Sequence, residues 1–145
     1  MASAEALLSA QDSIRSRFED FRRALDRRDE AAYRLALDDF HQQLKRWTAA
    51  EERVLLPVLA RTTFPGRVPQ RELTLEYVQL RELTRYLVSQ IAENAPIADV
   101  LGLVENLHRR LSAHESEMEK VYYPSAAPLL TPEEWKILRD SAPPS

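Results

Sequence analysis

WTAAEERVLLP, the stretch from Trp47 to Pro57, returns later in the chain as HESEMEKVYYP, from His114 to Pro124. When the two copies are superposed, Val54 falls on Val121 and the two prolines coincide. The second copy begins with a potential metal ligand, whereas the first begins with tryptophan. The chain is therefore predicted to consist of two related halves.

Length and composition limit the number of domains and the classes of partner that we expect. A chain of 145 residues has room for one domain, which we expect to span residues 1–145 with a core over about 4–124. The net charge of -3 gives no electrostatic reason to expect nucleic acid or a membrane as a partner. The chain has no cysteine, so a metal site would have to use nitrogen and oxygen ligands. The N-terminus does not read as a signal peptide, and we expect a cytoplasmic protein.

Apolar residues recur at steps of three and four, and only two glycines are present. This pattern predicts long helices over about 4–26, 30–57, 70–93 and 96–124, followed by a short C-terminal helix over about 132–140. A proline-containing loop is expected over 62–70, a looser chain after Pro124, and a frayed tail over 141–145. Four helices joined by short turns predict an all-α, up-down-up-down four-helix bundle.

Each predicted helix has one inward stripe. In chain order the four stripes are Leu7, Ile14, Phe18, Phe21, Leu25; Leu37, Phe40, Leu44, Trp47, Glu51, Val54; Leu73, Tyr77, Leu80, Thr84, Leu87, Ile91; and Val100, Val104, Leu107, Leu111, His114, Met118, Val121. Two polar groups interrupt this apolar seam, Glu51 in the second stripe and His114 in the fourth. A buried carboxylate and a buried imidazole need partners, so these two residues mark a candidate site.

A helix that ends in an acid-rich turn followed by LLP or YYP, found twice in a four-helix chain of this size, resembles the hemerythrin-like (HHE cation-binding) domain. The resemblance covers roughly residues 14–130. It implies a bundle that holds two iron ions, bound by a histidine from the first helix, a histidine and a glutamate four residues apart on the second, a histidine from the third, and a histidine with a carboxylate on the fourth.

Most of these ligands are replaced in this chain. By the resemblance, Phe18, Trp47 and Tyr77 stand where histidines are expected, and Met118 stands four residues after the matching His114. Three aromatic rings would fill the volume of the two ions and bury much apolar area. Phe18, Trp47, Tyr77 and Met118 are therefore predicted to form a plugged centre.

Glu51, His114 and Glu119 remain as possible metal ligands, and Tyr77 could add a phenolic oxygen. One histidine with two carboxylates resembles the donor set of sites that hold a single iron ion. The alternative is a polar pair of Glu51 and His114 across the bundle, with Tyr77 donating a hydrogen bond to the carboxylate. Glu119 fits the metal site poorly, because five residues along an α-helix place it on a different face from His114.

Two further groups of residues could have a role. His41 and His108 occupy equivalent places in the two halves and could form a second metal pair, or they could be half-exposed packing residues. An arginine cluster in the first helix could receive an anionic partner, or it could be a solvated face offset by neighbouring acids; it consists of Arg22, Arg23, Arg27 and Arg28.

No nucleophile with a neighbouring base, glycine-rich phosphate loop or HExxH pattern is present, and we predict no enzymatic activity. The first hypothesis is a module without a cofactor that binds a protein partner or a small hydrophobic molecule. The alternative is a protein that binds one iron ion and senses oxygen, redox state or iron. A homodimer is possible, with Trp135 and the segment 122–124 as candidate contacts.

Overall fold

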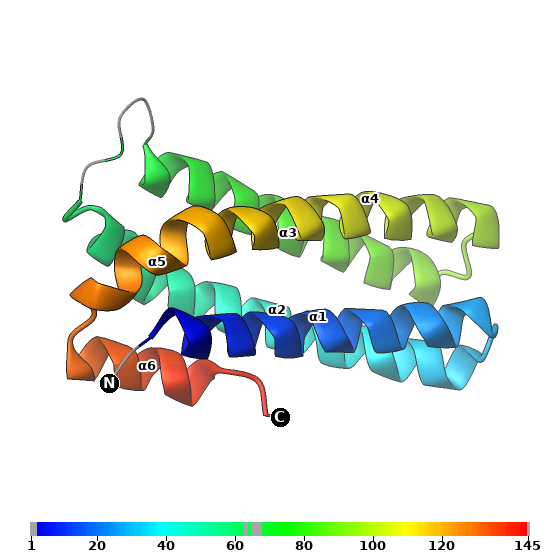
Figure 1. Cartoon of the computed structure of the whole chain (residues 1–145). Helices are drawn as coiled ribbons and strands as arrows, with labels where there is room; N and C mark the ends of the chain where they lie inside the picture. Colours follow the sequence, from blue (N-terminus) through cyan, green and yellow to red (C-terminus); the bar gives the residue numbers. More distant parts are fainter. Residues whose placement is uncertain (1–2, 63, 65–67, 145) are drawn as a thin grey trace.

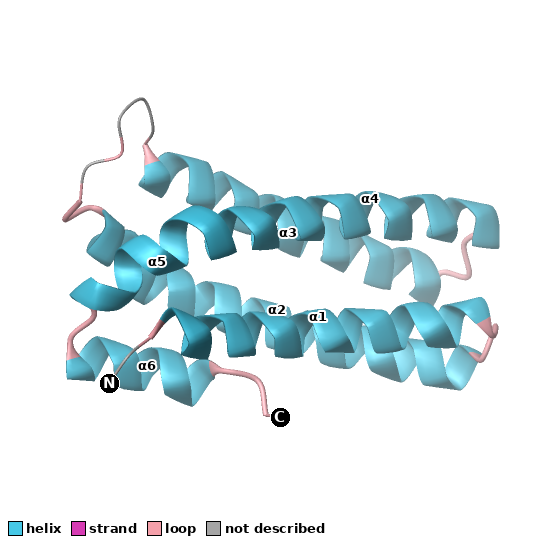
Figure 2. Cartoon of the chain, viewed as in Figure 1, coloured by secondary structure: helices cyan, strands magenta, loops and turns pink. Residues whose placement is uncertain are grey.

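The computed structural model describes residues 3–62, 64 and 68–144, and within these ranges the chain is helical, with no strand (Figure 2). The four long helices run side by side along the molecule (Figure 1). They are α1 (Ala4–Asp26), α2 (Glu30–Leu59), α3 (Pro69–Ala92) and α4 (Ile97–Glu117). The predicted all-α bundle of four long helices is confirmed. None of the described helices is long and apolar enough to cross a membrane.

Local signals in the sequence place the helix ends. Ser3 and Asp29 accept hydrogen bonds from the backbone at the starts of α1 and α2. Past the ends of α1 and α3, Arg28 and Asn94 adopt positive φ angles of 57° and 56°, and paired backbone hydrogen bonds close both helix ends. These tight stops bring consecutive helices together as antiparallel neighbours. Part of the loop predicted at 62–70 lies outside the described residues.

The core is built from the predicted inward stripes. Every stripe residue on α1, α2 and α3 is buried, Glu51 among them. In the fourth stripe Val121 is the exception, because it is only half-buried. The periodicity of apolar residues was therefore a sound guide wherever the chain is a regular α-helix.

The helical path changes just where the prediction for Val121 fails. After α4, residues Met118–Tyr122 form a π-helical segment, η1, and the chain continues as α5 (Tyr123–Ala126) and a 3-10 turn, η2 (Ala127–Leu129). A π-turn holds more residues than an α-turn, so it rotates the side chains that follow it. Tyr122 and Tyr123 are consequently both fully buried. The chain is helical up to Leu129, so the looser segment predicted after Pro124 was wrong.

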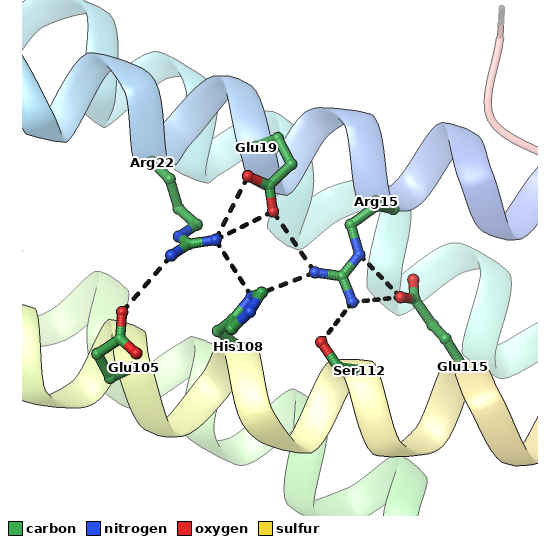
Figure 3. Close-up of polar contacts among 7 residues, drawn as sticks. All are labelled: Arg15, Glu19, Arg22, Glu105, His108, Ser112 and Glu115. Carbon is green, nitrogen blue, oxygen red and sulfur yellow. Dashed lines mark hydrogen bonds and ion pairs between the residues drawn. The ribbon is translucent and has the colours of Figure 1, made fainter.

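A polar network joins α1 to α4 along one side of the bundle (Figure 3). Arg15 donates from Nε to Glu115 Oε1 at 2.8 Å and from Nη2 to the Ser112 hydroxyl at 2.9 Å. Arg15 and Arg22 each place an Nη1 nitrogen 3.3 and 3.2 Å from Nδ1 of His108. A guanidinium can only donate, so Nδ1 of His108 accepts both bonds and its proton lies on Nε2.

The C-terminal segment packs against the bundle. Helix α6 (Pro132–Ser141) begins with the capping box predicted from its sequence and contacts α2. Pro143 is buried, and Arg17 donates to the Pro144 carbonyl oxygen at 2.7 Å. The described part of the tail is thus docked, and the predicted fraying was wrong. Trp135 is half-buried against the core.

Candidate functional site

Four of the predicted site residues meet in one layer at the middle of the bundle. Helix α2 contributes Trp47 and Glu51, one turn apart, while α3 contributes Tyr77 and α4 contributes His114. Their exposed fractions are 4%, 1%, 0% and 6%. The Tyr77 and His114 rings meet edge to face with centroids 5.5 Å apart. We call these four residues, together with Tyr123, the central layer.

Glu51 is the buried charge of the central layer. The Tyr123 hydroxyl donates to Glu51 Oε2 at 2.9 Å. Burial raises the pKa of Glu51 to about 7, although the nearby His114 and the Tyr123 hydrogen bond both oppose the rise. Glu51 therefore changes charge close to neutral pH, which is unusual for a glutamate.

His114 is held from the other side, by a residue that the sequence did not single out. Its Nδ1 atom lies 2.7 Å from Oε1 of Glu76 on α3. An ionised carboxylate only accepts hydrogen bonds, so Nδ1 carries the proton. Glu76 has a side chain 33% exposed, so the pair connects the buried ring to the surface. The predicted direct hydrogen bond between Glu51 and His114 is replaced by separate partners for each.

Tyr77 does not donate to Glu51 as predicted. Its hydroxyl is buried and has no hydrogen-bond partner among the described residues. Burial and the charge of Glu51 raise the pKa of Tyr77 well above its usual value, so the phenol stays protonated. Tyr123, reached only through the π-helical segment, takes the place that was predicted for Tyr77.

The other predicted site residues lie elsewhere. Phe18 belongs to a neighbouring layer, where its ring lies 5.1 Å from Phe40 and stacks on His108. Glu119 is exposed and so lies outside the central layer. Met118 is fully buried, as the plug required.

The centre of the bundle is nearly filled. The small cavity beside Trp47, Glu51 and His114 measures about 10 Å³, which is room for about one water molecule. On α1 it is lined by Gln11 and Ile14, which occupy the level that was predicted for Phe18. Side chains thus occupy the volume that two iron ions and their bridging oxygen would need.

The central layer also lacks the donor set for two iron ions. Within the described residues, no group of three or more His, Cys, Asp or Glu side chains is placed to hold a metal ion. Glu51 and His114 are the only carboxylate and imidazole of the central layer, and a tryptophan cannot bind metal through its protonated indole nitrogen. The pair of iron ions that the resemblance implies does not fit this arrangement.

His41 and His108 do not form a second metal pair. His108 faces α1, where it accepts hydrogen bonds from arginines. Burial and the charge of Lys45 lower the pKa of His41, and Arg85 on α3 adds to the effect. In the predicted arginine cluster, Arg22 and Arg23 pair with the acids Glu19 and Asp20. Two of the four arginines of that cluster are therefore paired with acids of their own helix.

Sequence reasoning missed Tyr123 and Glu76 for different reasons. Glu76 directly precedes Tyr77 and is only half-buried, so its contact with His114 depends on how α3 and α4 dock. Tyr123 aligns with Leu56, which is half-buried, and the repeat gave no reason to expect full burial. A tyrosine pair in place of a leucine pair was the one available signal.

Tyr123→Phe tests the hydrogen bond to Glu51. Removing the hydroxyl leaves a buried carboxyl oxygen without its donor, so we expect a loss of about 1–3 kcal/mol in the free energy of unfolding. The loss should be larger at pH 8 than at pH 5, because the hydroxyl stabilises the ionised carboxylate. Urea unfolding measures both values. Tyr122→Phe is the matched control, since its hydroxyl reaches the half-buried Glu72 at 3.0 Å; equal losses would contradict the assignment.

Glu51→Gln tests the raised pKa. The folded protein binds the Glu51 proton more tightly than the unfolded chain does, so stability from this group is present below pH 4.5 and is lost as pH rises to about 7. The free energy of unfolding of the variant should therefore rise relative to that of the wild type across this window, by on the order of 3 kcal/mol. This difference should level off above pH 7. Urea unfolding at several pH values measures the difference. A difference that stays flat with pH would refute the raised pKa.

Trp47→Ala tests the packed centre. Truncating a large buried aromatic side chain should cost about 3–5 kcal/mol. Thermal and urea unfolding measure the loss. A cost below about 1 kcal/mol would show that Trp47 does not fill the core.

Comparisons with known proteins agree with the geometry of the fold. The family model of the hemerythrin HHE cation binding domain matches residues 3–126, which contain all four long helices and the central layer. A search of curated proteins found no match, and neither did a search of solved structures. The match covers most of the chain, and the chain belongs to the hemerythrin HHE cation-binding domain family.

Proposed function

We propose that this chain is a hemerythrin-fold domain that has exchanged the two-iron centre for a packed core and acts as a non-catalytic binding module. The observation that carries the proposal is the filled central layer. Trp47 is buried and the cavity beside it measures about 10 Å³. The same observation argues against a small hydrophobic ligand inside the bundle, because the centre has no space for one. The binding surface is then on the outside.

One observation favours a second candidate, a site for a single metal ion at Glu51 and His114. A histidine that binds metal usually donates its other ring N–H to a carboxylate, which fixes the ring. Glu76 holds His114 in that way, at 2.7 Å. The two residues fall short of the three protein ligands that a tightly held ion generally needs, so we rank this candidate second.

Anaerobic titration with ferrous iron, followed by desalting and elemental analysis, separates the two candidates. We expect less than about a tenth of an iron ion per chain, because the central layer offers two ligands and no space. One iron per chain that is lost in Glu51→Ala and in His114→Ala would support the second candidate. His108→Ala is the matched control, since it removes a histidine outside the central layer. Two irons per chain would contradict both candidates.

A cytoplasmic location stays a prediction. Homodimer formation also stays a prediction. Of the contacts considered for it, Tyr122 and Tyr123 are fully buried, Pro124 is exposed and Trp135 is half-buried against the core.

A further inference from the structure

A surface cleft lies between α3 and α4, directly outside the central layer. Its volume is about 330 Å³, at the lower end of the range for small-molecule sites. Leu80 and Ala113 supply its apolar surface, and His114 lines both this cleft and the small cavity beside Trp47. The His114 imidazole thus lies between the surface cleft and the central layer.

One end of the cleft presents hydrogen-bond donors. Arg110 donates from Nη1 to Gln79 Oε1 at 3.1 Å and from Nε to Asn106 Oδ1 at 3.3 Å. These two amide oxygens hold the guanidinium in place without neutralising it. No carboxylate pairs with Arg110 among the described residues, so its Nη2 atom and the Gln79 amide nitrogen remain available to an anionic group.

The next turn of the cleft presents an acceptor. Glu76 uses Oε1 for His114, and its other carboxylate oxygen has no partner among the described residues. Gln79 follows Glu76 by three residues on α3, a rise of roughly 4.5 Å, so the donor end and the acceptor end lie on neighbouring turns of the helix. Between them lies the apolar surface of Leu80.

We propose that this cleft binds a small zwitterion, an aliphatic α-amino acid, with its carboxylate on Arg110 and Gln79 and its ammonium group on Glu76. The two charges of an α-amino acid are adjacent, and a hydrogen bond of about 2.9 Å on each side lets them reach groups on neighbouring turns of a helix. The aliphatic side chain then covers Leu80 and Ala113. This inference rests on the proposal that the domain acts by binding, and it names the class of ligand.

Binding at Glu76 also reaches the core. The ammonium group of the ligand would bind the same carboxylate that holds His114, and His114 is in ring contact with Tyr77. The cleft is therefore placed so that its occupancy alters the central layer.

The test uses the full chain, free of added metal, and L-leucine as the probe. Isothermal titration measures affinity, and amide shifts in a two-dimensional NMR spectrum locate the site. We expect shifts at Gln79, Ala113 and His114. Two blocked ligands, L-leucine methyl ester and N-acetyl-L-leucine, each lack one charge and should bind at least roughly tenfold more weakly.

Two variants and a control complete the design. Arg110→Gln and Glu76→Gln should each weaken L-leucine binding by roughly tenfold or more, whereas Arg109→Gln, which removes a neighbouring exposed arginine outside the cleft, should leave it unchanged.

The proposal is overturned if L-leucine does not bind, if its shifts map away from the cleft, or if either blocked ligand binds as well as the parent. The two ligand derivatives test the wild-type chain, so the result stands even if a variant fails to fold. Iron uptake in the separate titration would overturn the proposed function alone, which keeps the two failures distinct.

Discussion

A carboxyl group removed from water in the middle of a helical bundle must find donors or take up a proton, and Glu51 is under this constraint. With 1% of its surface exposed, it has the Tyr123 hydroxyl as its hydrogen-bond donor, and the nearby His114 opposes the rise in its pKa. The surrounding layer follows from this requirement. The π-helical segment brings Tyr123 inward, and Glu76 orients the imidazole from the surface.

The family relationship gives this arrangement its meaning. In a bundle that holds two metal ions, the ions neutralise the carboxylates around them. Here Trp47 and Tyr77 lie beside Glu51 and bring no charge, and burial raises the pKa of Glu51 to about 7. A buried polar group among aromatic side chains is less stable than an apolar core would be. That it persists next to a surface cleft is the strongest reason to look for a binding role there.

The two copies of the repeat show how related sequences diverge in structure. Val54 and Leu55 are buried in the first copy, whereas Tyr122 and Tyr123 are buried in the second and Val121 is only half-buried. One π-helical segment is enough to move the buried face along by about one residue. The contact between α1 and α4 is polar on one side, where Arg15 and Arg22 bind their acidic partners (Figure 3).

The sequence by itself determined the helices, the bundle and the family, because apolar periodicity and capping residues act locally and the two proline-terminated helix ends carry the family's spacing. It also identified Glu51, His114, Trp47 and Tyr77 as inward residues. Only the tertiary structure decided their partners. Glu76 and Tyr123 reach the central layer through helix docking and a π-helical segment, and Phe18 and Glu119 fall outside it for the same reason: α-helical spacing specifies a face of one helix, while the level at which two helices meet depends on how all their side chains pack.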